Sequence, residues 1–208
     1  MSDLCTRVHS FFNQLERFHF PFDKLNIPLN GIYILFELNE KAHGGDRIVR
    51  VGTHTGNNQL RARIQQHFVQ ENKDRSIFRK NIGRALLNKD GDDFLNHWEI
   101  DLTTREAKKI YQDVIDFDKQ RLIEEKVSSY LRDSFYFVFV QIDDKEKRLS
   151  IESKIISCIS LCQLCCPSNN WLGLYSPKEK IRQSGLWQVN ELYKNPLTDN
   201  ELNWLETL

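Results

Sequence analysis

The chain has no apolar run long enough to cross a membrane, and this absence sets the first limit on its function. A transmembrane helix needs about 20 predominantly apolar residues, and no run in the sequence approaches that length. The opening residues MSDLCTRVHSFFNQ also lack a basic start followed by an apolar core, so we expect no secretory signal. Internal repeats and low-complexity linkers are absent too. The sequence therefore predicts a soluble, cytoplasmic protein without a membrane partner.

Net charge is absent as well, with 29 Lys and Arg against 29 Asp and Glu, which by itself is poor support for a nucleic-acid partner. The charges are unevenly spread, however. Between Arg47 and Arg84 nine basic residues face two acidic ones, whereas between Asp90 and Glu125 eleven acidic residues face five basic ones. Phosphate affinity depends on local cation density, and salt screens charges beyond about 8–10 Å. The basic block therefore predicts a phosphate-binding surface, with a solvated helix face as the alternative.

Cysteines are few, and their placement argues against a disulfide framework. There are five, and four of them lie between Cys158 and Cys166, which favours a reducing compartment. The four, Cys158, Cys162, Cys165 and Cys166, suggest a zinc site. Zinc sites usually join two short Cys/His knuckles far apart in sequence, and the sequence shows no second knuckle. We predict free cysteines that pack as small hydrophobes.

The apolar pattern predicts an α/β (α+β) fold with a small central mixed or antiparallel sheet of about three strands, flanked by helices. Strand patterns lie at 31–38, 47–53, 94–102 and 134–142. Helical patterns lie within 1–25, 58–68, 75–88, 103–132 and 150–166, and again from about Pro177 onward. Thr103-x-x-Glu106 reads as a capping box, and Ser150 as a helix cap. We expect one domain over 1–208, with a core at about 29–88 and 134–175, a helical insertion at about 103–132, and N- and C-terminal helical extensions.

Three polar side chains follow one another along this predicted core. Tyr33 stands in the first strand after Gly31-Ile32, and a second strand ends at Val51-Gly52. Arg63 and His67 then lie four residues apart on a predicted helix, so they project side by side. Glu152 follows much later, near the start of a largely apolar helix.

This ordered set resembles the GIY-YIG nuclease family in Gly31-Ile32-Tyr33, Arg50-Val51-Gly52, Arg63-x-x-x-His67, Glu152 and a later Asn. The resemblance covers about 31–68 well and 134–171 loosely. It implies a divalent-metal-dependent DNA endonuclease, which hydrolyses phosphodiester bonds with Mg²⁺ or Mn²⁺.

The resemblance also implies a role for each residue. Tyr33 would activate or orient the attacking water, and His67 would position Tyr33 or share protons with it. Arg63 would hold the scissile phosphate through its planar, permanently charged fork. Glu152 would be the single protein ligand for Mg²⁺, which prefers few carboxylates and several waters. Asn170, preferred over Asn169, would brace the site.

The second motif departs from the family pattern, because Arg50 stands where the family has its second tyrosine. Thr53 also occupies a position that is often lysine. We interpret Arg50 as an auxiliary phosphate ligand and His54 as an auxiliary proton carrier or phosphate contact. The loss of that phenol puts the two-tyrosine arrangement of the family in question.

Each assignment has a structural alternative. Tyr33 could be an ordinary strand tyrosine, Arg63 and His67 a solvated helix pair, Glu152 a first-turn carboxylate facing the helix dipole, and Asn170 a turn residue. Six further cations of the basic block are predicted to bind nucleic acid: Arg47, Arg61, Arg75, Arg79, Lys80 and Arg84.

Three classes of function remain open. The first is the endonuclease, acting on duplex or branched DNA. The second is a catalytically lapsed nucleic-acid-binding or protein-interaction module on the same fold, and a purely structural protein is a third alternative. The insertion at 103–132 could read DNA, form a homodimer or contact a protein partner, and its acidity argues against backbone contact.

Overall fold

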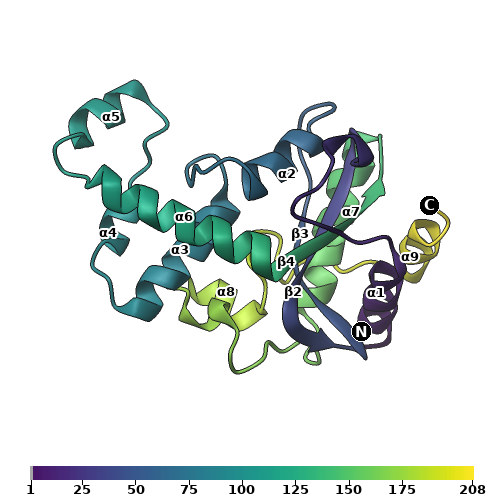
Figure 1. The fold of residues 1–208 in the computed structure, drawn as a ribbon. Helices are drawn as coiled ribbons and strands as arrows, with labels where there is room; N and C mark the ends of the chain where they lie inside the picture. The colour runs from purple at the N-terminus through teal and green to yellow at the C-terminus, as the bar shows by residue number, and fades with distance from the viewer. Residues whose placement is uncertain (1) are drawn as a thin grey trace.

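A central antiparallel sheet organises the fold in this computed structural model, which describes residues 2–208 (Figure 1). In the described chain the sheet has four strands in the order β1-β4-β2-β3. These are β1 (Phe18–His19), β2 (Gly31–Ala42), β3 (Gly45–Gly52) and β4 (Phe135–Gln141). The sheet is thus wholly antiparallel, and β1 adds a two-residue edge to the three predicted strands. β3 forms the opposite edge.

The centre of the sheet requires a glycine at the start of β2. Gly31 pairs with Gln141 of β4, and a Cβ atom at Gly31 would lie 2.4 Å from the carbonyl oxygen of Val140. Because that oxygen belongs to the backbone, only the absence of a side chain allows the two strands to approach so closely.

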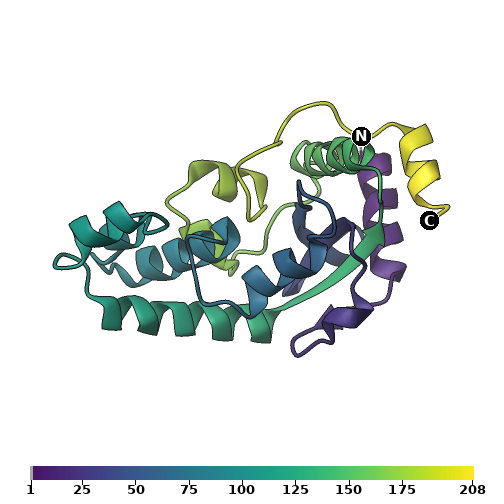
Figure 2. The same ribbon diagram turned by 90° about the horizontal axis from the view of Figure 1, so that it is seen from above.

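Helices cover both faces of the sheet. On one face α2 (Leu60–Phe68), α3 (Ile77–Asp90) and α6 (Phe117–Ser134) pack over Tyr33, Leu35 and Phe137. On the other face α1, α7 and α9 pack over Ile32, Ile34 and Phe36. Figure 2 shows α6 and α7 on opposite sides of the sheet. The bounds on the second face are α1 Ser2–Gln14, α7 Lys145–Ser160 and α9 Asp199–Leu205. The alternation of apolar residues in β2 thus divides the core into two layers.

Shorter elements connect these layers. They are η1 (Lys24–Asn26), α4 (Leu95–Trp98), α5 (Arg105–Tyr111), η2 (Leu172–Tyr175) and α8 (Glu179–Ser184). None of the helices among residues 2–208 combines the length and the apolar character that a bilayer span requires.

Three local predictions were wrong. Residues 94–102 contain the short helix α4 instead of a strand, because the indole of Trp98 is buried against Gly83 and donates to the carbonyl oxygen of Lys80 at 3.0 Å. The single helix expected over 103–132 is two helices, with Thr104 capping α5 and Asp116 capping α6. Asp144, not Ser150, caps α7, which therefore begins at Lys145.

The basic and acidic blocks of the sequence pair with each other in the fold. Arg79 on α3 is fully buried and donates to the Glu124 carboxylate of α6 at 2.7 Å. Arg84 forms a second ion pair with Glu99. Much of the charge asymmetry along the chain is therefore cancelled where these helices pack together.

Candidate active site

A cavity of about 530 Å³ lies along the free edge of β3 and brings together residues from both faces of the sheet. α2 and α3 approach it from one face and α7 from the other, while the segment after α8 closes it. Its lining contains the following polar residues: Arg50, Thr53, His54, Thr55, Arg63, Asn81, Glu152, Ser153, Gln188, Asn190 and Glu191. The structure thus places Arg50, His54, Arg63 and Glu152 around one space.

A β-bulge in β3 directs Arg50 toward this cavity. Leu35 pairs with Arg50 but Phe36 pairs with Ile48, so Val49 is an extra residue on β3. Bulges of this kind re-aim side chains next to functional sites. Arg50 donates from Nη1 to the carbonyl oxygen of Trp187, and its guanidinium lies 5.0 Å from the ring centroid of Phe78.

The Nε atom of Arg50 is buried and has no hydrogen-bond partner among the described residues. A buried donor without a partner costs about 1–3 kcal/mol, and more when the group is charged. Arg50 is therefore a permanent cation on the cavity wall with spare donor capacity.

Glu152 lies in the middle of α7, not in its first turn, so interaction with the helix dipole does not account for it. Burial raises the pKa of the Glu152 carboxyl from 4.5 to about 7, against the lowering influence of the guanidinium groups of Arg50 and Arg63 and of a backbone hydrogen bond from Thr53. The nearby carboxylate of Glu191 raises it further. A cation that binds beside such a carboxylate stabilises its ionised form.

Tyr33 and His67 form a buried pair on the α2 side of the sheet. The Tyr33 hydroxyl lies 2.8 Å from Nε2 of His67, and Nδ1 of His67 lies 2.7 Å from Oγ of Ser76. Burial, reinforced by Arg63, Arg50 and Arg79, holds the pKa of His67 well below 6.5. His67 is therefore uncharged at neutral pH. Both rings are almost fully buried, and neither residue belongs to the cavity lining.

Arg63 lies between the cavity and a second, adjoining cavity. Its Nη1 donates to Oε1 of Gln66 at 3.1 Å and to the carbonyl oxygen of Arg75 at 3.4 Å. Its side chain also lines an adjoining cavity with Thr53 and His54. Arg63 is only half-buried, so part of its fork remains free for an anion.

His54 is fixed by the backbone. Its Nδ1–H donates to the carbonyl oxygen of Gly56 at 2.7 Å, and its Nε2 accepts from the backbone N–H of Gly31 at 3.4 Å. Burial lowers its pKa. His54 thus ties the start of β2 to the loop after β3 and borders the cavity as a neutral ring.

Two sets of predicted residues lie elsewhere. Asn170 is exposed and does not line the cavity, so the structure does not bring it to the site. The phosphate role expected of Arg47 and Arg79 is wrong, because both guanidinium groups are fully buried and paired with Glu40 and Glu124.

The remaining cations of that set differ among themselves. Arg84 and Lys80 are largely buried and interact with Glu99, through its carboxylate and its carbonyl oxygen respectively. Arg61 donates to the carbonyl oxygens of Ile27 and Leu25. Arg75 is exposed. Of the six, Arg75 alone therefore presents a largely open side chain.

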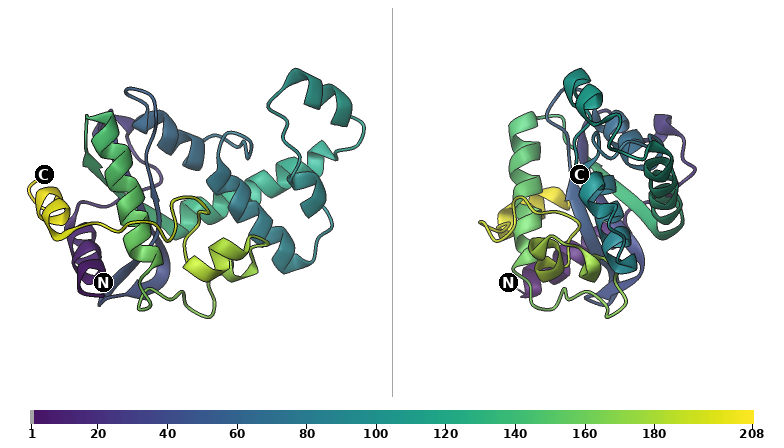
Figure 3. Two further views of the ribbon diagram at one scale, coloured as in Figure 1. Left: turned by 180° about the vertical axis from the view of Figure 1, so that it is seen from behind. Right: turned by 90° about the vertical axis from the view of Figure 1, so that its left-hand side faces the viewer.

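Sequence reasoning missed the C-terminal wall of the cavity. The backbone N–H of Trp187 donates to the carbonyl oxygen of Val49 at 2.8 Å, and the backbone N–H of Val51 donates to Oε1 of Gln188 at 3.0 Å. This segment covers the free edge of β3 and brings Asn190 and Glu191 to the cavity. Figure 3 shows it running past α7 toward α9. No motif marks these residues in the sequence.

Replacing Gly52 by Ala is expected to destabilise the protein by about 1–3 kcal/mol, the usual range for overpacking a core. A Cβ atom there would lie 2.3 Å from the Tyr33 hydroxyl and would push it away from His67. Urea unfolding measures this change. Gly56→Ala is the control, because the atoms nearest to its Cβ would be the far end of the flexible Gln59 side chain, which can move aside. Equal stability of the two variants would contradict the tight packing of Gly52 on Tyr33.

Comparison with known proteins gives one match. The sequence profile of the family described as GIY-YIG domain matches residues 3–208, nearly the whole chain. Neither the search of curated proteins nor the search of solved structures found a match.

Proposed function

The chain belongs to the GIY-YIG domain family, and from this premise we propose that it is a divalent-metal-dependent DNA endonuclease that hydrolyses phosphodiester bonds at the β3-edge cavity. The GIY-YIG domain is a nuclease-type fold. The observation that carries the proposal is that Arg50, Arg63 and Glu152 surround one cavity. Two permanent cations and one carboxylate are what a metal-assisted reaction on a phosphodiester needs.

The donor set around Glu152 fits Mg²⁺ or Mn²⁺. Mg²⁺ is usually bound through one or two carboxylates, with water and substrate phosphate completing its shell. Glu152 supplies one partly buried carboxylate to the cavity, and the carboxylate of Glu191 lies near it. When bound there, the cation would neutralise charge that develops on the phosphate oxygens.

The residues of the chain have separate tasks in this proposal. Arg63 binds the scissile phosphate with the free part of its fork, and Arg50 adds a second positive charge from the cavity floor. Tyr33 orients the attacking water with its hydroxyl, and the phenol O–H donates a hydrogen bond to Nε2 of His67, whose Nδ1–H donates to Oγ of Ser76. Because burial holds the pKa of His67 well below 6.5, the ring stays neutral, so Nε2 accepts this hydrogen bond and orients the phenol.

A second candidate is a catalytically lapsed nucleic-acid-binding module. It is favoured by Arg50, which occupies the place of the second motif's tyrosine, and by the Tyr33 hydroxyl, which is covered by Gly52 and does not line the cavity. For Tyr33 to act, its hydroxyl must gain access to the cavity when DNA binds. Cleavage separates the two candidates.

The test is nicking and linearisation of plasmid and of branched DNA with Mg²⁺ or Mn²⁺. Wild type is expected to cut, and Arg63→Ala to lower the rate by about 10²–10³-fold, the usual cost of removing one preorganised group. Tyr33→Phe is expected to lose a comparable factor. Arg121→Ala, which removes an exposed guanidinium on α6, should cut like wild type. Binding of DNA by wild type without any cleavage would support the lapsed module instead.

The wider setting belongs to the same proposal. We treat 1–208 as one nuclease domain whose insertion, α5 and α6, offers a surface for a homodimer or a protein partner. We place the enzyme in the cytoplasm, with duplex or branched DNA as its substrate.

A further inference from the structure

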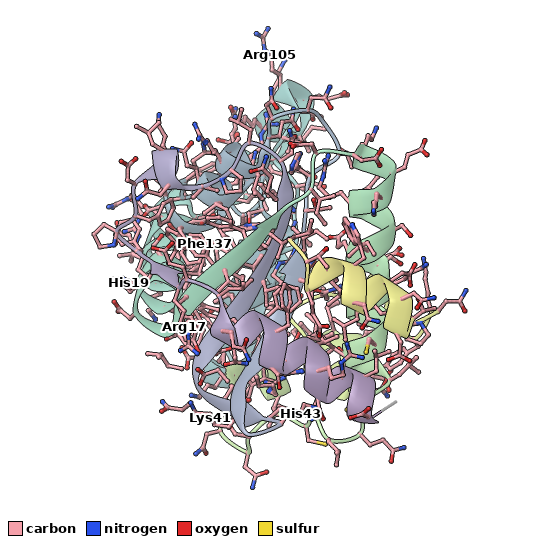
Figure 4. All side chains as sticks on the ribbon, turned by 90° about the vertical axis from the view of Figure 1, so that its right-hand side faces the viewer. Arg17, His19, Lys41, His43, Arg105 and Phe137 are labelled. Carbon is pink, nitrogen blue, oxygen red and sulfur yellow. The ribbon has the colours of Figure 1, made fainter. Side chains whose placement is uncertain are left out.

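A cluster of sulfur and imidazole groups lies on the α1 side of the sheet, remote from the β3-edge cavity. Cys5 and His9 come from α1, His43 from the β2–β3 turn, and Cys165 from the loop after α7. Their potential ligand atoms all lie within 4.8 Å of one another. Figure 4 labels His43 beside α1 at one end of the molecule. None of these residues lines the cavity that holds Glu152.

The separations within the cluster match a metal-binding tetrahedron. Sγ of Cys5 lies 3.4 Å from Sγ of Cys165, and Nε2 of His43 lies 3.1 Å from the same sulfur. Zinc bound at its usual distances to sulfur and nitrogen would separate two sulfurs by about 3.8 Å, and a sulfur and a nitrogen by about 3.6 Å. Each of these two separations is therefore within about half an ångström of the value that a bound zinc ion would set.

The backbone and a hydroxyl fix His43 with Nε2 toward the sulfurs. His43 has φ +52° and Gly44 has φ +75°, so the two-residue hairpin turn holds a histidine in a left-handed conformation that few residues adopt. Such strain is typical of functional positions. Nδ1 of His43 lies 2.8 Å from Oγ1 of Thr6. Zinc-bound histidines commonly use their second nitrogen in this way.

The fourth ligand is either His9 or Cys162, and the hydrogen bonds favour Cys162. Nδ1–H of His9 donates to the carbonyl oxygen of Cys5 at 3.0 Å, while Nε2 accepts from the N–H of Ile48 at 3.2 Å, so both nitrogens are engaged. Sγ of Cys162 lies 3.5 Å from Nε2 of His43. Cys162 and Cys165 also have the Cys-x-x-Cys spacing of zinc knuckles.

We propose that Cys5, His43, Cys162 and Cys165 bind one Zn²⁺ ion, with His9 packed beside the site. Four protein ligands leave no open position, so the ion is structural and not catalytic. It joins α1, the β2–β3 hairpin and the end of α7, the helix that carries Glu152. On this proposal Cys162 and Cys165 are metal ligands and not simple hydrophobes, and the second half of the site is Cys5 and His43.

The test measures zinc in the full-length protein, purified without a metal-chelating column. Mass spectrometry of metals is expected to find about one zinc ion per chain in wild type and almost none in Cys5→Ser or Cys165→Ser. Cys166→Ser is the matched control, because Cys166 lies on the same loop but is exposed, and it should retain its zinc. Absence of zinc from wild type grown with zinc would overturn the proposal.

Two further measurements remain decisive if a serine variant fails to fold. Replacing zinc by Co²⁺ in wild type is expected to give thiolate-to-cobalt absorption and the intense visible bands of tetrahedral cobalt. After metal removal, the intact mass under non-reducing conditions should be that of a chain with five free thiols. A mass lower by two hydrogens, with peptide mapping that places a disulfide between Cys5 and Cys165, would instead overturn the site. Loss of zinc from His9→Gln but not from Cys162→Ser would overturn the choice of Cys162.

Discussion

Replacing Glu152 by Gln is expected to lower the rate of DNA cleavage by about 10³-fold or more. Gln keeps the shape of the side chain but removes the negative charge that would attract the divalent cation. Glu152 lies partly buried in the middle of α7 and lines the same cavity as Arg50 and Arg63, and it is the carboxylate that we assign to the metal. Initial rates on plasmid over a range of Mg²⁺ concentrations measure the effect. Glu146→Gln, the same change at an exposed position of the same helix, should leave the rate unchanged.

The pH dependence of wild type follows from the same carboxylate. Its pKa of about 7 means that the proton competes with the cation, so cleavage at low Mg²⁺ is expected to rise about tenfold per pH unit up to about pH 7 and then level off. Higher Mg²⁺ should move the midpoint to lower pH. Burial lowers the pKa values of His54 and His67 below 6.5, whereas it raises the pKa of Glu152. A rate independent of pH between about 5.5 and 8 would contradict the assignment.

The free energy of unfolding of Glu152→Gln shows whether a loss of activity comes from lost chemistry or from lost folding. The pKa of Glu152 is higher in the folded than in the unfolded chain, so the folded state retains the proton over the interval between 4.5 and about 7. Ionisation of Glu152 therefore costs stability as the pH rises through that interval. Glu152→Gln removes this cost and should be more stable than wild type by about 1–3 kcal/mol at pH 8 without metal. An inactive but stabilised variant would identify Glu152 as a functional residue. An inactive variant that is less stable would instead indicate a structural role.

The sequence predicted best what depends on local pattern. β2 and β4 are rich in β-branched and aromatic residues, and both formed where expected, although β2 extends to Ala42. The contact of Tyr33 with His67 was implied by the family resemblance and not by local pattern. The residues at 94–102 show the limit of that reasoning. Their strand-like composition reflects the burial of Trp98 against Gly83, and this contact depends on a glycine in another helix. Tertiary packing overrides local propensity in such segments.

Contacts between distant segments could not be read from the chain. The basic block suggested a phosphate surface because charge was counted along the sequence, whereas Arg79 pairs with a carboxylate 45 residues away. The wall of the cavity around Asn190 depends on the C-terminal segment covering the edge of β3, which no periodicity reveals. The cysteine cluster lacked a second knuckle in sequence because its partners, Cys5 and His43, come from α1 and a hairpin turn. In each case the decisive partner belongs to another element.

The buried ion pair of Arg79 and Glu124 is expected to give the largest stability effect in the protein. Arg79 donates from Nε and Nη2 to Oε2 of Glu124 at 3.0 and 2.7 Å, and from Nη2 to Oγ of Ser128 at 2.8 Å. Removing one partner of a buried pair leaves an uncompensated charge, which costs about 3–5 kcal/mol. Glu124→Ala should lower the free energy of unfolding by that amount. Glu125→Ala, at the adjacent exposed position, should change it by about 1 kcal/mol or less.

The same pair should also affect the site, because Arg79 supports His67. Its Nη1 donates to the carbonyl oxygen of His67 at 3.0 Å, and its backbone N–H donates to Oγ of Ser76, the partner of the His67 ring. Glu124→Ala is therefore expected to lower the rate of DNA cleavage even at temperatures below its melting transition. The double variant Arg79→Leu/Glu124→Leu should recover most of the stability, because an apolar pair of similar volume replaces a buried ion pair at little cost. The double variant should nevertheless remain slow, because the guanidinium donor to the carbonyl oxygen of His67 is lost. If it regained both stability and activity, the pair would serve only to join α3 to α6, and the link from Arg79 to the Tyr33–His67 pair would be wrong.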